Sequence, residues 1–397
     1  MKYVILILCI IFAAACMVLL LRRREKTKTP EPEPVPTDEP SLQIERVPAE
    51  EVPPEEEMVE LPDSGIRDLL LNLLPDAQQV TEWLQKAIRK GGDAMEVKIP
   101  SKTAAKTAAK KTSSSAAGKL VQLGDDAVGL ALSATGAVSA VNLSLMVVSA
   151  VEMKKIDDSL NGIRDSISKI TDFQDNEYRS RVYSLLAHIR EYTDFQGEIL
   201  GSESLRQSKL SQLNGLEEEC TKLLGQANLT LAGYAKKEVL GFSAYEKELT
   251  EAEKWLLYQE ALLNILTEIA DLRYTLNLGT VSRQHCGALL PIYARQSAKA
   301  RNELRAWHFD ALDRLDIDTE HGRRRRSGFD EALHFVPGLF DDRQKYTELD
   351  ENTRNMIQEQ TAEPKDLPRA DEKNPYDEAI RLIAKDGKLF YLPEEKK

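Results

Sequence analysis

Residues Ala127–Val151 read AVGLALSATGAVSAVNLSLMVVSAV and contain no charged residue. They lead directly into Glu152–Ile170, EMKKIDDSLNGIRDSISKI, where five aliphatic residues recur at spacings of 4, 3, 4 and 3. This alternation is the a/d stripe of an amphipathic helix that packs along a seam. The five residues are Ile156, Leu160, Ile163, Ile167 and Ile170. A charge-free apolar run continuous with such a helix predicts a helical protein associated with a membrane.

We expect 119–151 to form one apolar helix, and its role leaves three alternatives open. Its length and lack of charge permit a second transmembrane span, but its small and polar residues oppose insertion about as strongly as its Val and Leu residues favour it. A helix buried in a bundle and a segment that inserts conditionally are the other two alternatives. Two rows of small residues at four-residue spacing would let another helix approach closely. One row is Gly129, Ser133 and Ala137, and the other is Gly136, Ala140 and Ser144.

The N-terminal segment 1–24 is predicted to be a membrane anchor. Val4–Leu21 is a run of eighteen apolar residues, long enough to span a bilayer. Arg22, Arg23 and Arg24 follow it at once, so the positive-inside rule places the bulk of the chain on the cytoplasmic side of a single-pass protein. Cleavage after Ala15 is the competing interpretation, but a secretory signal carries its positive charge before the apolar run.

Three segments of different composition separate this anchor from the central helix. The first, 25–62, holds nine of the seventeen prolines and twelve acidic residues, which predicts a disordered linker. The second, 63–92, has the periodicity of two short amphipathic helices. The third, 93–118, is predicted to be a flexible tract of Lys, Ala and Ser, and its lysines suit anionic lipid headgroups as well as a solvated linker.

The remaining chain is predicted to be an antiparallel bundle of long helices with coiled-coil character, 152–340, followed by a charged C-terminal tail, 341–397. A second apolar stripe begins at Tyr178, eight residues after Ile170, so we expect one helix with a local irregularity up to the break at Gly201-Ser202. Short breaks between helices favour antiparallel neighbours. In the tail we expect a short helix near Tyr376–Lys385 and a docking strand or hook at 387–392. No strand pattern of any length is evident, and the fold class is all-α.

The sequence contains little recognisable chemistry. The net charge is −12, with an isoelectric point near 5.2, so nucleic-acid binding is not expected. The acidic residues around Asp316 fail the EF-hand register, because His321 stands where glycine is required. His308 and His321 could hold a metal with these acids, but a solvated turn paired with Arg323–Arg326 is favoured. No catalytic residue, cofactor or metal site is predicted, and the protein is not expected to be an enzyme.

Two functions follow from this organisation. The first is a membrane-anchored helical scaffold or interaction protein that contacts membrane lipids and binds protein partners, or itself, through its helices. The alternative is a membrane-active protein that uses Ala127–Val151 to perturb a bilayer. Its layout loosely resembles that of helical pore-forming or membrane-remodelling proteins, without a shared motif.

Overall fold

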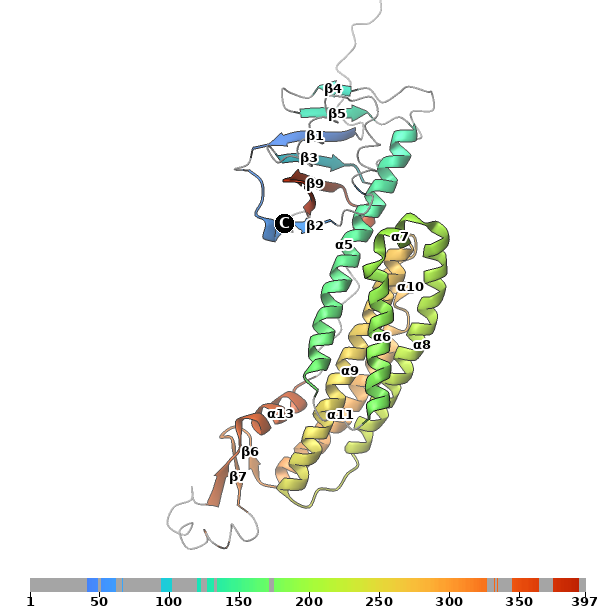
Figure 1. The fold of residues 1–397 in the computed structure, drawn as a ribbon. Helices are drawn as coiled ribbons and strands as arrows, with labels where there is room; N and C mark the ends of the chain where they lie inside the picture. Colours follow the sequence, from blue (N-terminus) through green and yellow to red (C-terminus); the bar gives the residue numbers. More distant parts are fainter. Residues whose placement is uncertain are drawn as a thin grey trace, which may run out of the picture. The chain divides into compact units, whose positions relative to one another are not determined.

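The computed structural model describes residues 41–48, 51–61, 66, 94–101, 120–122, 127–131, 134–170, 175–326, 332, 334, 345–363 and 374–392. Within these ranges the protein is mostly helical, and it also contains a seven-stranded and a three-stranded sheet (Figure 1). The helices are α5 (Ala134–Ser168), α6 (Asn176–Asp194), α7 (Gln196–Gly201), α8 (Glu203–Tyr234), α9 (Phe242–Leu276), α10 (Arg283–Cys286), α11 (Leu290–Arg314) and α13 (Glu351–Thr361). A mostly helical protein is therefore confirmed, but the all-α fold class is wrong.

The seven-stranded sheet joins segments from both ends of the described chain. Its strands are β1 (Ser41–Val47), β2 (Val59–Glu60), β3 (Ala94–Ile99), β4 (Leu120–Gln122), β5 (Ala127–Ala131), β9 (Ile380–Lys385) and β10 (Lys388–Leu392). They lie in the order β2-β10-β9-β3-β1-β5-β4, and all neighbours are antiparallel. The C-terminal hairpin enters between β2 and β3, with Val97 opposite Leu382. The helices from α5 to α13 are thus an insertion between strands of one sheet.

The hairpin β9–β10 corrects the predicted helix near Tyr376–Lys385. Only Pro375–Asp377 is helical there, as a single 3-10 turn, and a strand begins at Ile380. Asp386 and Gly387 form the two-residue turn, with φ of 49° and 84°. Positive φ at both central residues defines the turn that matches the twist of paired strands, and Asp-Gly is a typical sequence for it. The alternation of Ile380, Leu382 and Ala384 supplies the face that is buried in the core.

Strands also occupy segments that were predicted to be unstructured. The segment 25–62 contains β1, a 3-10 turn at Glu55–Glu57 and β2, and 93–118 begins with β3. The tail 341–397 contains β8 (Tyr346–Glu348), α13, β9 and β10. The docking strand expected at 387–392 is confirmed, since β10 pairs with β2 and β9. Amino-acid composition did not indicate most of these strands, because they pair with segments far away in the sequence. Ile44, for example, lies opposite Val97 and Val128. The two helices predicted in 63–92 lie almost wholly outside the described residues.

The apolar stretch Ala127–Val151 is divided between a strand and a helix, so the single helix over 119–151 is wrong. Ala127–Ala131 forms β5, and α5 begins at Ala134. In α5, Leu143, Val147 and Val148 are buried with side chains of the sheet in one apolar core. Among the helices of the described ranges, none combines the length and the apolarity that crossing a membrane requires.

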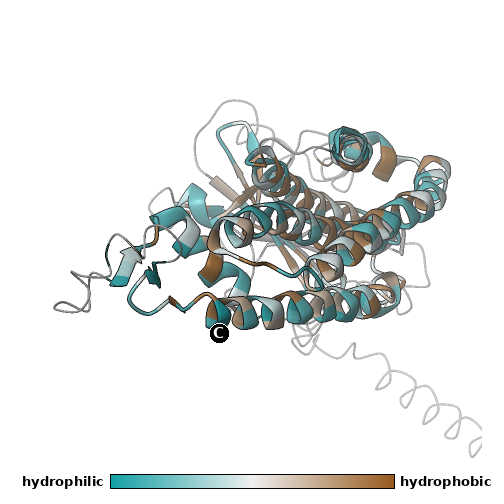
Figure 2. Cartoon of the chain, turned by 90° about the horizontal axis from the view of Figure 1, so that it is seen from below, coloured by the Kyte–Doolittle hydropathy of each residue, from teal (hydrophilic) through white to brown (hydrophobic). Residues whose placement is uncertain are grey.

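A second apolar core runs between the long helices, which pack side by side. The stripe Ile156, Leu160, Ile163, Ile167 and Ile170 lies in this core, and no member is more than 4% exposed. Figure 2 views the helices from below and shows hydrophobic and hydrophilic residues alternating along them. The amphipathic pattern therefore identified side chains that are buried between helices.

The chain leaves the helical conformation between the two stripes, so the prediction of one helix up to residue 200 is wrong. Helix α5 ends at Ser168, and α6 begins at Asn176 and packs against it. The Asp175 carboxylate accepts a hydrogen bond from the backbone N–H of Tyr178 at 2.9 Å and caps the new helix. The eight-residue offset in the pattern marks this break.

Polar contacts join the sheet segment to the helices around Tyr376. The Tyr376 hydroxyl lies 3.0 Å from Ser149 Oγ of α5, and its ring packs edge-on against Tyr274 of α9 at 5.4 Å between centroids. Gly279 follows α9 with φ of 62°, and a Cβ there would lie 2.4 Å from the Tyr376 ring. A left-handed backbone and a close aromatic neighbour together require glycine at this position.

Candidate functional site

An open groove lies where α5, α7 and the start of α8 meet. Its volume is about 860 Å³. Its apolar lining comes from Leu145 and Met146 of α5, Leu200 of α7 and Leu278, which follows α9. These four side chains come from three separate parts of the chain, so the groove exists only in the folded protein.

The turn from α6 into α7 shapes one side of the groove. Helix α6 ends at Asp194, and Phe195 stands between the two helices with φ of −106° and ψ of 23°. Ser202 then ends α7 and caps α8, since its hydroxyl accepts a hydrogen bond from the Leu205 N–H at 3.4 Å. This tight connection leaves the Phe195 side chain at the groove 52% exposed. An exposed aromatic residue beside an apolar hollow is typical of a surface that contacts another molecule.

Negative charge predominates around the groove. Asp194, Glu198 and Glu203 line it together with a single cation, Arg206. Within the described ranges, the ion pair recorded for these four residues joins Asp194 to Arg190, at 4.0 Å. Such a long and partly exposed pair contributes little. The groove thus presents an apolar surface flanked by three carboxylates and one guanidinium group.

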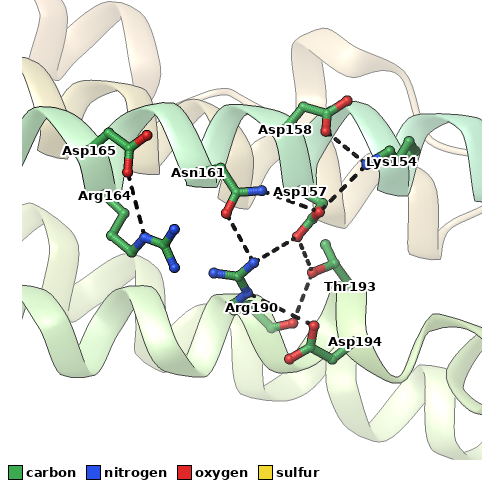
Figure 3. A network of polar contacts seen from close by, with 9 residues as sticks. All are labelled: Lys154, Asp157, Asp158, Asn161, Arg164, Asp165, Arg190, Thr193 and Asp194. Carbon is green, nitrogen blue, oxygen red and sulfur yellow. Dashed lines mark hydrogen bonds and ion pairs between the residues drawn. The ribbon is translucent and has the colours of Figure 1, made fainter.

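A polar network beside the groove holds the end of α6 against α5 (Figure 3). Arg190 of α6 donates a hydrogen bond to Asn161 Oδ1 of α5 at 3.0 Å and lies 3.7 Å from a carboxylate oxygen of Asp157. The Thr193 hydroxyl lies 3.4 Å from the same carboxylate. Asp194, the next residue, lines the groove. The wall formed by α6 and α7 is therefore fixed to α5 by side-chain contacts.

The structure separates the small residues that were predicted to form helix-packing rows. Gly129 lies in β5, opposite Gln43 and Val121, whereas Gly136, Ala140 and Ser144 lie in α5. Ala140 and Ser144 are buried. Ser133 and the predicted anchor residues Val4, Leu21, Arg22, Arg23 and Arg24 lie outside the described residues. A row that begins in a strand cannot form one helix face.

The groove is not evident from the amino-acid sequence. Its one local signal is Phe195-Gln196-Gly197-Glu198, where an aromatic residue and glycine interrupt an amphipathic helix. For the apolar residues of α5 that line the groove, the sequence predicts a transmembrane span, a helix buried in a bundle or a conditionally inserting segment. Nothing in their spacing indicates that Leu145 and Met146 lie opposite α7.

The two histidines considered as metal ligands lie in different environments. His308 is completely buried, and burial lowers its pKa to about 4 despite a hydrogen bond to Gln360. Gln360 uses its Nε2 to donate to the Leu249 carbonyl, so His308 Nε2 donates to Gln360 Oε1 at 2.8 Å and Nδ1 accepts from the Tyr245 hydroxyl. His321 is exposed and bonded to Asp318. Within the described ranges, no cluster of potential metal ligands is present.

Buried carboxylates lie between α5 and α9. Glu268 is 8% exposed and accepts a hydrogen bond from the Ser159 hydroxyl at 2.5 Å. Burial raises the pKa of Glu268 to about 7, and the negative charges of Asp271 and Glu152 act in the same direction. Arg283 bridges Glu152 and Asp271 and lies over the Tyr274 ring at 4.4 Å. These groups tie α5, α9 and α10 together and make this interface sensitive to protonation.

No protein family, no curated protein and no solved structure matches this chain.

Proposed function

We propose that this protein is a membrane-anchored scaffold that binds protein partners through its helical region. In this proposal Val4–Leu21 holds the chain in the membrane, and the long helices form an antiparallel bundle with coiled-coil character. The observation that carries the proposal is the open, apolar, acid-flanked groove between α5, α7 and α8. A partially exposed phenylalanine beside such a groove is the kind of anchor on which protein interfaces depend.

The environment of α5 argues against the membrane-active alternative. Leu143, Val147 and Val148 are at most 2% exposed and are already buried against the sheet. Before insertion, these side chains would have to leave this core. Exposing each of them to water costs about 1.5–3 kcal/mol relative to keeping it buried. The bilayer would then only replace the apolar environment that these side chains already have in the folded protein, so insertion gains little.

Site-specific photocrosslinking tests the proposed function. A photoreactive amino acid replaces Asn142, an exposed groove residue, or Glu238, an exposed residue beyond the far end of α8. The full chain is expressed in cells, and the cell membranes are washed at alkaline pH to remove peripheral proteins before analysis. We expect the chain to stay in the membrane and to form a discrete protein adduct from position 142, with none from position 238. Equal adducts from both positions, or none from either, would contradict a binding role for the groove.

Topology and membrane activity require separate measurements. Of the four natural cysteines, Cys220 and Cys286 are buried and should resist labelling, and Cys9 and Cys16 of the apolar run Val4–Leu21 are replaced by alanine. An exposed serine of α8 then supplies the labelling site in the variant Ser211→Cys. We expect an impermeant maleimide to label it only after the cytoplasmic side is opened. Full-length protein added to dye-loaded anionic vesicles should release no dye. Release that Leu143→Asp abolishes would favour the membrane-active alternative.

A further inference from the structure

We propose that the groove binds the apolar face of a basic amphipathic helix from a partner protein. This inference rests on the proposed scaffold function and specifies the chemistry of the partner. Helices that dock in grooves present apolar anchors at i, i+3 or i+4, and i+7, which together form one continuous apolar stripe. Leu145, Met146, Leu200 and Leu278 offer a complementary surface, with Phe195 beside it.

The charges around the groove select a cationic partner. Asp194, Glu198 and Glu203 outnumber Arg206, and their carboxylates are exposed to solvent. Lysine or arginine on the flanks of a docked helix would lie within the distance over which such charges interact at physiological salt, about 8 Å. Exposed charge pairs of this kind govern association rate and specificity more than affinity.

Two other occupants fit the groove less well. A small molecule is usually enclosed over most of its surface, whereas Phe195 is half exposed and Glu198 and Glu203 are open to solvent. A second copy of this chain carries a net charge of −12, which opposes approach to an acidic surface. A helix lying along the surface satisfies both the openness and the charge.

The groove is also held in shape before a partner arrives. Arg190, Asp157, Asn161 and Thr193 fix the end of α6 against α5 (Figure 3). Ser202 caps α8 immediately after α7. A wall held by these contacts loses little freedom when a partner binds, which favours affinity.

Fluorescence anisotropy with a synthetic helical peptide tests this proposal. The probe contains leucine at i, i+3, i+4 and i+7 and lysine elsewhere, and a second peptide replaces each lysine with glutamate. Full-length protein in nanodiscs of zwitterionic lipid is titrated against each peptide, with empty nanodiscs as the baseline. We expect saturable binding of the lysine peptide, weakened by added salt, and no binding of the glutamate peptide.

Matched variants locate the binding site. Combining Glu198→Lys with Glu203→Lys should weaken binding by about tenfold or more, and Phe195→Ala should also weaken it. The control Glu238→Lys lies beyond the other end of α8 and makes the same charge change as either single substitution. It should leave affinity within about twofold. Circular dichroism and thermal unfolding of each variant exclude loss of folding as the cause.

Other outcomes overturn the inference. Equal affinity for wild type and the double charge-reversal variant would place the peptide elsewhere. Binding that appears only after the lysines of 102–119 are replaced by glutamine would mean that the chain's own basic segment occupies the groove. Failure of the peptide to bind, together with crosslinks from position 142, would reject the basic helix and leave the scaffold function standing. The absence of both would reject both.

Discussion

Replacing the buried Glu268 with glutamine should stabilise this protein at alkaline pH. The carboxyl lies between α5 and α9, is 8% exposed, and accepts a hydrogen bond from Ser159. Burial raises its pKa from 4.5 to about 7. Glutamine keeps the accepting oxygen and removes the charge, so the variant isolates the cost of ionising a buried carboxyl.

The direction of the pH dependence follows from proton binding. Between pH 4.5 and 7 the folded protein retains a proton at Glu268 that the unfolded chain releases, so the free energy of unfolding falls as pH rises through this window. With these two pKa values, ionisation lowers stability by about 3 kcal/mol at pH 8 and by about 1 kcal/mol at pH 5. Glu268→Gln should therefore gain about 2 kcal/mol more at pH 8 than at pH 5.

Urea unfolding of the full chain in detergent micelles, followed by circular dichroism at both pH values, measures this difference. The control is Glu260→Gln on the same helix, whose side chain is 61% exposed and 3.6 Å from Arg301. It should change the free energy of unfolding by less than about 1 kcal/mol at either pH. If Glu268→Gln destabilises the protein at pH 8, or has the same effect at both pH values, the carboxyl is not penalised by burial as we argue.

Three further changes test other parts of the structure. Burial lowers the pKa of His308 from 6.5 to about 4, so the neutral ring favours folding above pH 6.5. The free energy of unfolding should fall as pH falls towards 4, by about 2 kcal/mol at pH 5. His308→Gln should reduce this part of the acid dependence, as measured by urea unfolding at each pH. Gly279→Ala should lower the melting temperature, because its φ is 62° and the new Cβ would meet Tyr376, whereas Gly233→Ala, with no neighbour within 4 Å, should not. Ile163→Ala should cost about 2–5 kcal/mol in urea unfolding, and a loss below 1 kcal/mol would contradict its burial in the core.

The spacing of apolar residues predicted helices correctly where a single apolar stripe is buried in the core between the helices. Ile156 to Ile170 recur at helical spacing, and each is buried. Most strands were not predicted, because they are short or, like β1, β3 and β9, pair with segments far away in the sequence. The strand expected at 387–392 is β10. One local signal was overlooked: Asp386-Gly387 stands between two alternating runs and forms the hairpin turn.

The amino-acid sequence by itself determined the long amphipathic helices that follow Glu152, because amphipathic periodicity is a property of neighbouring residues along one helix. It also set the abundance of acid that gives the groove its negative rim. Only the tertiary structure decided that β9 and β10 join the sheet that contains β1 and β3. It also decided that Leu145 and Met146 line a groove together with α7 and Leu278. Apolar burial is non-directional and proportional to area, so an apolar run such as Ala127–Val151 does not specify its partner. Strand pairing and packing with distant segments give parts of that run different places in the fold. Ala127–Ala131 forms a strand, Leu143 and Val147 lie in the core beside the sheet, and Leu145 and Met146 line the groove.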